Sequence, residues 1–310
     1  MTTLPLQEER FDSGLTRLPA WFRQEIPDAN KIESMKEMFR GSRLHTVCES
    51  AHCPNMGKCW GQGVATFMIL GEVCTRACRF CAVKSGLPQL VDHQEPHNVA
   101  RAVQELKLRY VVITSVARDD LKDEGAGHFV ETIAEIRRLT PHVKIEVLIP
   151  DFSAKHDSLK ALTDAAPEVV SHNIETVRRL SRQIRPQAQH DRSLDVLRMM
   201  QKLNKNIFIK SSFMAGIGET DEEITQLMQE LLDAGCQILT IGQYLAPTQL
   251  KRHVPVQRFV TPAQFEEYRT LGMKMGFKYV MSAPLVRSSY IAEEGYRGCM
   301  EALSLSGSKA

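Results

Sequence analysis

Residues 66–83 read TFMILGEVCTRACRFCAV, an apolar stretch of strand length followed at once by three cysteines. The spacing of these cysteines is Cys74-x3-Cys78-x2-Cys81. The apolar residues before them are bulky or β-branched and the stretch is short, which is typical of a buried strand in a parallel sheet. In α/β barrels the chemistry lies at the C-terminal ends of such strands. The stretch therefore predicts a first barrel strand that leads directly into a cysteine site.

The alternation of strand and helix continues along the chain. Further apolar runs occupy residues 110–115, 143–149, 169–174, 207–214 and 237–241. Amphipathic helices, with apolar residues three or four positions apart, are predicted at 99–107, 128–139, 158–165, 193–202 and 221–232. Six strand–helix units without a hairpin signal indicate a parallel sheet wound in one sense. Because a full barrel has eight units, we predict an α/β fold that forms a partial (β/α)6 parallel barrel.

The rest of the chain is predicted to flank this barrel. We expect an N-terminal extension at 1–60 that carries a second group of cysteines, the barrel at 61–282, and a C-terminal tail at 283–310. Two helix starts have strong local signals. Thr220 precedes three acids at 221–223, and Thr261 precedes Pro262.

The composition is that of an ordinary soluble enzyme, with 43% hydrophobic and 25% charged residues in a chain of 310. No apolar run reaches the roughly 18 residues of a membrane helix. The N-terminus, MTTLPLQEERFDSG, has no apolar signal core and contains acids that a transit peptide avoids, so we expect a cytoplasmic location. The net charge of +2 is too small to indicate nucleic acid. We interpret basic runs such as Lys251-Arg252-His253 as solvated surface, and we expect neither nucleic acid nor a membrane as partner.

Six of the eight cysteines lie between positions 48 and 81, and the first three are spaced Cys48-x4-Cys53-x5-Cys59. Two triplets suggest two metal centres. A four-coordinate centre needs a fourth ligand, so each triplet either recruits a distant residue or leaves one iron open. Disulfides do not suit a reducing cytosol, and the spacings fit structural zinc poorly. Iron–sulfur ligation is therefore favoured, with His45 and His52 interpreted as flanking polar residues.

The loop CTRACRFC resembles the signature of the radical S-adenosylmethionine (SAM) superfamily, CxxxCxxC with an aromatic residue, here Phe80, before the last cysteine. The resemblance implies a 4Fe-4S cluster on Cys74, Cys78 and Cys81. Its open iron is chelated in that superfamily by the amino and carboxylate groups of SAM. One electron from the cluster then cleaves the sulfonium to give a 5′-deoxyadenosyl radical.

Further contacts with SAM come, in that superfamily, from strand ends and a glycine-containing loop. The candidates in this chain are Asn173, Glu175, Arg185, Gly216 and Gly218. A carboxylate suits the ribose hydroxyls, an arginine suits the SAM carboxylate, and glycines let the backbone approach the adenosine. Two structural alternatives stay open: Gly216 and Gly218 only shape a tight turn, or Glu175 caps a helix.

The resemblance narrows further at CESAHCPNMGKCW, residues 48–60, which is similar to the lipoyl synthase family. The segments TSVARDDLKDEGAGHF, VSHNIETV, GIGET, TIGQYLAPT and VRSSY also resemble that family, so the likeness covers about residues 18–292. It implies a second, auxiliary 4Fe-4S cluster on the first triplet, with the second serine of the RSSY motif, Ser289, as fourth ligand. Cys236 and Cys299 compete for this role because cysteine is the softer ligand. However, Cys236 precedes a predicted buried strand and Cys299 lies beyond the matched region.

The resemblance also implies a reaction and its partners. The lipoyl synthase family inserts sulfur at C6 and C8 of an octanoyl chain amide-linked to a lysine of a lipoyl carrier domain, using two SAM molecules and consuming the auxiliary cluster as the sulfur source. Such carriers are the E2 subunits of 2-oxoacid dehydrogenases and the glycine cleavage H protein. An electron donor and a protein that rebuilds the cluster are expected too. Three alternatives stay open: biotin-synthase-like insertion into a small free substrate, a two-cluster electron carrier, and a zinc-stabilised binding module.

Overall fold

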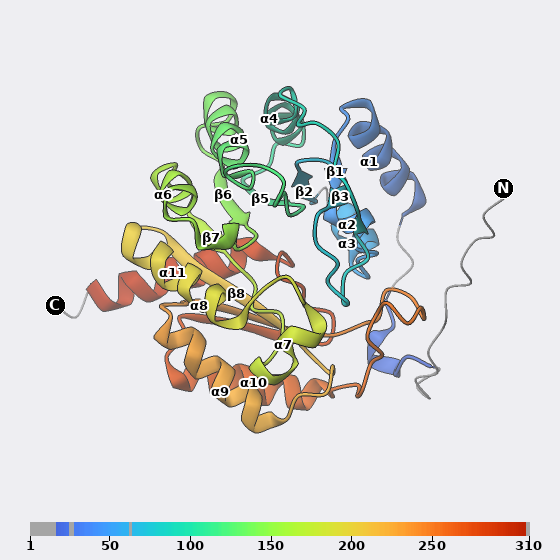
Figure 1. Cartoon of the computed structure of the whole chain (residues 1–310), viewed down its shortest axis with the longest axis vertical. Helices are drawn as coiled ribbons and strands as arrows, with labels where there is room; N and C mark the ends of the chain where they lie inside the picture. The colour runs from blue at the N-terminus through green and yellow to red at the C-terminus, as the bar shows by residue number, and fades with distance from the viewer. Residues whose placement is uncertain (1–16, 25–27, 62–63, 308–310) are drawn as a thin grey trace.

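The structure, a computed structural model, describes residues 17–24, 28–61 and 64–307 (Figure 1). Within these residues the main sheet has eight strands, of which β1 pairs antiparallel with β2 and all later neighbours pair in parallel. In spatial order the strands are β1 (His45–Thr46), β2 (Thr66–Ile69), β5 (Tyr110–Ser115), β6 (Lys144–Leu148), β7 (Val169–Ser171), β8 (Phe208–Ala215), β9 (Ile238–Gln243) and β10 (Tyr279–Ala283).

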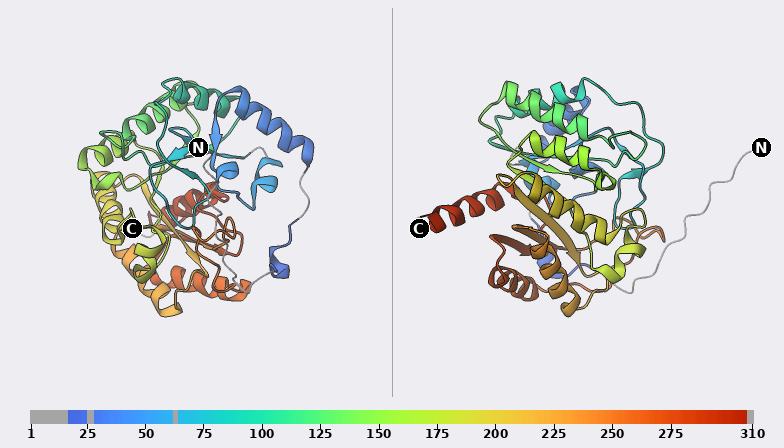
Figure 2. Two further views of the ribbon diagram at one scale, coloured as in Figure 1. Left: turned by 45° about the vertical axis from the view of Figure 1, so that its right-hand side comes forward. Right: turned by 60° about the vertical axis from the view of Figure 1, so that its left-hand side comes forward.

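The sheet curves into a barrel that stays open between β1 and β10 (Figure 2). Among the described residues no ladder joins these two edge strands. The predicted α/β partial parallel barrel is thus confirmed, and the six predicted strands correspond to β2 and β5 to β9. Strand β10 adds one more parallel strand beside β9, where the prediction had the barrel end. A second, small sheet pairs β3 (Val73–Cys74) with β4 (Lys84–Ser85).

Helices surround the sheet on its outer face, and one hydrophobic cluster fills the space between the two layers. The helices are η1 (Ala20–Phe22), α1 (Ala29–Gly41), α2 (Val47–Ser50), α3 (Met56–Gly61), α4 (Glu95–Glu105), α5 (Ala126–Leu139), η2 (Phe152–Ala154), α6 (His156–Asp164), α7 (Arg178–Ile184), α8 (His190–Leu203), α9 (Asp221–Asp233), α10 (Pro262–Met275) and α11 (Ala292–Gly307). In the described ranges, none of these helices is both long and apolar enough to span a bilayer.

Both predicted helix starts are confirmed. Thr220 and Glu223 form a reciprocal capping box at the beginning of α9. The side chain of Thr261 accepts a hydrogen bond from the backbone of Gln264 at the start of α10, and Pro262 is the first residue of that helix. Each cap satisfies backbone N–H groups that have no partner within the helix.

Helix α11 closes the base of the barrel. The ring of Tyr296 lies 6.1 Å from that of Tyr110 and 5.9 Å from that of Phe208, measured between centroids. The close packing of α11 against β10 requires glycine on the side of the helix that faces the strand, because a Cβ at Gly298 would lie 2.6 Å from the Tyr279 ring. The first half of α11 therefore packs against the base of the barrel.

The predicted division into three parts stays a prediction. Its first boundary, at residues 60 and 61, falls inside α3, and its second, at 282 and 283, falls inside β10. Residues 1–16 of the predicted extension lie outside the described residues.

Candidate active site

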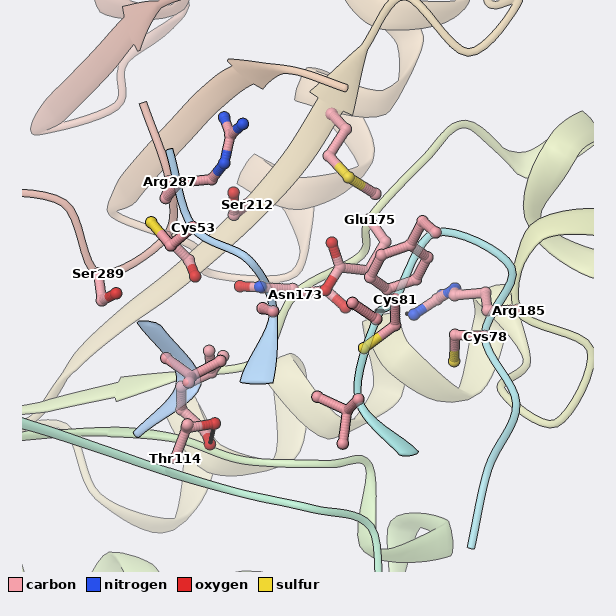
Figure 3. Close-up of a pocket in the computed structure, with 18 of the residues that line it drawn as sticks. Cys53, Cys78, Cys81, Thr114, Asn173, Glu175, Arg185, Ser212, Arg287 and Ser289 are labelled. Carbon is pink, nitrogen blue, oxygen red and sulfur yellow. Dashed lines mark hydrogen bonds between the residues drawn. The ribbon is translucent and has the colours of Figure 1, made fainter. Parts of the chain in front are cut away.

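Members of both cysteine triplets face one cavity at the C-terminal ends of the strands (Figure 3). The cavity has a volume of about 460 Å³. Parallel strands bring their carboxyl ends to the same rim, so residues far apart in the sequence meet there. The predicted site residues that line it are Cys48, Cys53, Cys74, Cys78, Cys81, Asn173, Glu175, Arg185 and Ser289.

Cys74 sits at the end of the short strand β3, where the backbone surrounds its sulfur with donors. The N–H groups of Arg76 and Ala117 point at its Sγ at 3.4 and 3.3 Å. Its own carbonyl accepts from the N–H of Gly86 at 2.9 Å. Hydrogen bonds to a cysteine sulfur stabilise the thiolate and tune an iron–sulfur centre. The loop therefore directs two backbone donors at the sulfur of Cys74.

Burial governs the ionisation of the other two cysteines of this loop. It raises the pKa of Cys78 to about 12 and that of Cys81 to about 11. Neighbouring thiols of the triplet and the carboxyl of Glu175 raise both pKa values further, so these groups lie close together. Arg185 acts on Cys78 in the opposite sense. A metal binds the thiolate, so thiols in this setting ionise together with the binding of a cation.

Arg76, inside the cysteine loop, fastens that loop to the barrel. Its Nη2 lies 2.6 Å from Asp119 and 2.7 Å from Asp151, and Arg192 lies 2.8 Å from the other oxygen of Asp151. Burial raises the pKa of Asp151, but the hydrogen bond and charge of Arg76 outweigh it and lower the pKa to about 2. The sequence gives no sign of this network, because nothing local connects positions 76, 119 and 151.

The segment after β9 covers the same loop from the other side. The guanidinium of Arg79 donates to the carbonyls of Lys251 and Arg252 at 3.1 and 3.3 Å. The ring Nε2 of His253 lies 3.1 Å from the carbonyl oxygen of Cys81. His253 is buried, so its interpretation as solvated surface was wrong, whereas Lys251 and Arg252 are exposed as expected. Burial lowers the pKa of His253, which keeps the ring neutral at physiological pH.

Asn173, Glu175 and Arg185 form one polar wall of the cavity (Figure 3). Burial raises the pKa of Glu175 to about 7, although Arg185 and Asn173 act to lower it. The guanidinium of Arg185 donates to the carbonyl of Asn173 at 3.2 Å. The side-chain Oδ1 of Asn173 is buried and has no hydrogen-bond partner. An open acceptor and a carboxylate facing a cavity fit a ligand with hydroxyl and ammonium groups, as SAM has.

The backbone of Glu175 has an unusual conformation at this wall. Its φ is +65°, in the left-handed region that non-glycine residues rarely adopt. It is fixed by hydrogen bonds with β8: its N–H donates to Ser212 and its carbonyl accepts from Met214, both at 3.0 Å. The N-cap of α7 is Val177, so Glu175 does not cap that helix.

Gly216 and Gly218 are not brought to the cavity wall. Their N–H groups donate to the carboxylate of Glu219 at 2.6 and 3.0 Å. Both have positive φ, and a Cβ at Gly216 would lie 2.4 Å from the carbonyl oxygen of Arg258. These contacts match the tight-turn alternative, and a contact of either glycine with SAM stays a prediction.

The first triplet lies on α2, α3 and the loop between them. Thr46 caps α2 by accepting from the N–H of Glu49 at 3.3 Å, which orients Cys48 inward. Cys59, on α3, does not line the cavity, but burial together with the nearby thiols of Cys48 and Cys53 raises its pKa to about 11. The three thiols are thus neighbours, and two of them reach the cavity.

The C-terminal tail lies against this triplet. The side chain of Asn55 donates to the carbonyl of Leu285 at 2.6 Å, and Lys58 Nζ lies 3.0 Å from the hydroxyl of Tyr290. Figure 3 shows Cys53, Arg287 and Ser289 on the same side of the cavity. Arg287 is half-buried. Desolvation lowers its pKa, while the adjacent Cys53 acts in the opposite sense. Sequence positions more than 200 apart therefore meet at the predicted auxiliary centre.

The two cysteines that compete with Ser289 for the role of fourth ligand lie away from the cavity. Cys299 lies in a buried cluster with Val169, Phe208 and Ile238, near the base of the barrel. Cys236 is buried beside it and its Sγ donates to the carbonyl of Ile238 at 3.1 Å. Neither lines the cavity. All eight cysteines are free thiols, as cluster ligation requires.

Among the described residues, no group of three or more His, Cys, Asp or Glu side chains is arranged to hold a single metal ion. A four-iron cluster takes each thiolate on a different iron, so its ligands need not converge on one point. The two cysteine triplets therefore fit iron–sulfur clusters. The hydroxyl of Ser289 lies beside the first triplet.

The chain matches the radical SAM superfamily over residues 68–231 and the N-terminal domain of lipoyl synthase of that family over residues 6–53. A lipoyl synthase of Rubrobacter xylanophilus is 51% identical over 291 residues, which cover 94% of this chain and 89% of the relative. Lipoyl synthases of Flavobacterium psychrophilum and Caldicellulosiruptor bescii are 50% and 51% identical, each over 89% of this chain and 94% of the relative.

Solved structures agree in fold. Streptococcus suis SuiB bound to S-adenosylmethionine superposes with a TM-score of 0.54 at 10% identity, over 81% of this chain and 60% of that chain. HydG, a maturase of the FeFe hydrogenase, superposes with a TM-score of 0.54 at 13% identity, over 89% of this chain and 61% of that chain.

Proposed function

The chain belongs to the lipoyl synthase family of the radical SAM superfamily, and we propose that it inserts two sulfur atoms, at C6 and C8, into an octanoyl group carried on a protein lysine. The family implies a 4Fe-4S cluster and SAM. We propose that Cys74, Cys78 and Cys81 hold this cluster. We propose further that Cys48, Cys53, Cys59 and Ser289 hold an auxiliary 4Fe-4S cluster that is the sulfur source.

The observation that carries the proposal is that members of both triplets line one cavity together with Ser289. A substrate held in that cavity is within reach of both centres, as hydrogen removal and sulfur addition at the same carbon demand. A two-cluster electron carrier needs no such space. A biotin-synthase-like site would place its auxiliary ligands along barrel strands, whereas the ligands proposed here belong to α2, α3, the loop between them and the tail.

When bound, the cofactors of the two sites would supply two things: the radical that removes a hydrogen atom from unactivated carbon, and the sulfur that takes the place of that hydrogen. No side-chain base can do this, because acid–base tuning covers only a few pKa units. The protein residues bind and orient. Glu175 and Asn173 offer acceptors to SAM, and Arg185 holds Asn173 in place and offsets the charge of Glu175.

The hydrocarbon chain is expected to lie against the apolar part of the cavity wall, which includes Val47, Met68, Leu148 and Phe213. These side chains exclude water from the reacting carbons. Ser289 is a harder ligand than cysteine and releases iron more readily, which suits a cluster that must be dismantled. The segment that carries Ser289 is held by the contacts of Asn55 and Lys58.

We propose the lipoyl carrier domains of 2-oxoacid dehydrogenase E2 subunits and the glycine cleavage H protein as substrates. An electron donor and a protein that rebuilds the auxiliary cluster are proposed as further partners, in the cytoplasm. The carrier is expected to dock at the cavity mouth, where the N-terminal loop and the tail meet.

The test is anaerobic reconstitution followed by incubation with SAM, a reductant and an octanoyl-lysine peptide, read by mass spectrometry. The expected result is two sulfur atoms added, two 5′-deoxyadenosines formed per product, and about one turnover. Cys59→Ala is the matched control: it should cleave SAM but add no sulfur. If the wild-type protein cleaved SAM but added no sulfur to the peptide, the proposed substrate would be wrong. If it bound iron but did not cleave SAM, an electron carrier would be favoured.

A further inference from the structure

A charged layer lies inside the barrel, between its strands. Lys210 of β8 and Glu146 of β6 form an ion pair with an Nζ–Oε1 distance of 2.7 Å, and each side chain is only 1% exposed. The hydroxyl of Tyr110, on β5, donates to the other oxygen of Glu146, also at 2.7 Å. Both carboxylate oxygens are therefore satisfied, and three strands hold the pair in place.

Strand geometry puts this layer directly beneath the cavity. Leu148 and Ser212 line the cavity, and Glu146 and Lys210 precede them by two residues on the same strands. Residues two apart in a strand point to the same face and are separated by about 6.6 Å along it. The ion pair therefore faces the barrel interior one layer closer to the base than the cavity wall.

In the part of the chain that the structure describes, aromatic rings lie on the far side of this layer. Tyr110 packs against Tyr296 of α11, which also contacts Phe208 at the start of β8. Ser171 pairs in register with Lys210 and adds a buried hydroxyl to the layer. Below the apolar wall, the interior is thus polar first and then filled by aromatic rings.

We propose that the Lys210–Glu146 pair is the floor of the acyl site and sets the longest chain that the site accepts; this inference rests on the proposed function. An alkyl chain that entered from the mouth would end against a satisfied ion pair. To go deeper it would have to displace these two side chains, which fill the interior at this level and are held by each other and by the hydroxyl of Tyr110. In open apolar space, each further buried methylene would instead strengthen binding about fourfold.

The test measures dissociation constants of lysine peptides acylated with hexanoyl, octanoyl or decanoyl groups on the reconstituted protein, by competition fluorescence anisotropy. For the wild type, affinity should rise from hexanoyl to octanoyl and then stop. If the affinity of the wild type instead rose by about fifteenfold from octanoyl to decanoyl, the value for two freely buried methylenes, this measurement alone would refute the proposed floor.

The double variant Lys210→Ala/Glu146→Gln should remove the limit. It opens space beneath the cavity, leaves no unpaired buried charge, and keeps an acceptor for the Tyr110 hydroxyl. Decanoyl should then bind about tenfold tighter than octanoyl. The control Lys210→Met/Glu146→Gln fills nearly the same space and should keep the wild-type preference. The steric floor would be refuted if Lys210→Ala/Glu146→Gln kept the chain-length preference of the wild type. It would also be refuted if the control Lys210→Met/Glu146→Gln bound decanoyl over octanoyl as strongly as that variant does.

The outcomes separate this inference from the proposed function. If the proposed function fails, the octanoyl peptide binds no better than the unacylated peptide and gains no sulfur. If only the floor fails, the octanoyl peptide binds and is converted, but chain-length preference does not respond to positions 146 and 210. Iron content and far-UV circular dichroism of each variant verify that the comparison is between folded, loaded proteins.

Discussion

Replacing Glu175 by glutamine should stabilise the cluster-free protein at alkaline pH while it weakens SAM binding. Burial raises the pKa of Glu175 from 4.5 to about 7. A carboxyl with a raised pKa in the folded state contributes stability below the unfolded pKa, and that stability is lost as the pH rises through the folded pKa. At about 1.36 kcal/mol per pKa unit, the loss amounts to about 3 kcal/mol at pH 8. Water in the cavity screens part of the effect, so this figure is an upper bound.

Glutamine has no proton to lose, so Glu175→Gln should escape this loss. Its advantage over the wild type in free energy of unfolding should grow by up to roughly 2–3 kcal/mol between pH 5 and pH 8. The assay is urea unfolding of the reduced, cluster-free protein, followed by circular dichroism at several pH values. Glu37→Gln removes an exposed carboxylate on α1 and is the control, with no comparable growth expected.

The same variant, once reconstituted, should bind SAM about tenfold or more weakly, because a hydrogen bond to a charged group contributes about 1.5–3 kcal/mol. A stability gain that is equal at pH 5 and pH 8 would refute the argument from burial of the carboxylate. Unchanged SAM affinity together with the expected pH dependence would leave the burial argument intact and remove Glu175 from the binding site.

Cys59→Ala should lose about four irons per chain and keep the other cluster, measured by iron and sulfide analysis; unchanged iron would remove Cys59 from the auxiliary centre. Gly242→Ala should displace the tail, because a Cβ there would lie 2.0 Å from the carbonyl oxygen of Val286. A cost of about 1–3 kcal/mol in urea unfolding and reduced auxiliary iron are expected, against no effect for Gly41→Ala, where a Cβ meets nothing within 4 Å. Asp151→Asn should cost about 2 kcal/mol at pH 7, since Arg76 lowers the pKa of this buried carboxyl from 3.8 to about 2. The difference from the wild type should shrink as the pH falls from about 4 to about 2; a difference that is constant over that range would contradict the assignment.

The strands that are buried on both faces were predictable because their pattern is continuous and local. The predicted strand at 110–115 coincides with β5, and the run at 143–149 contains β6. The predicted strand at 169–174 is longer than β7, which ends at Ser171. Strand β10 was not predicted, and neither was α11. The two glycines of α11 that face strands weaken an isolated helix, and only packing against Ile238 and Tyr279 explains them.

The cysteine spacings identified both groups of thiols, because a metal centre imposes short, regular spacing on its ligands. The side chains that fasten these loops were not recognisable. Arg76 is paired with Asp119 and Asp151, and His253 reaches the backbone of Cys81. These partners are 43 to 172 positions apart, so no window of sequence contains both members of a pair.

The sequence by itself determined the strand–helix repeat, the two cysteine groups and the family, because each depends on residues within a few positions of one another. Only the tertiary structure decided that both groups face one cavity, that Gly216 and Gly218 lie away from it, and that Lys210 and Glu146 lie beneath it. These features arise where separate strands converge, and their contacts join residues as far apart as Asn55 and Leu285. A cavity is a property of how strands close around a space, and local patterns carry no information about that closure.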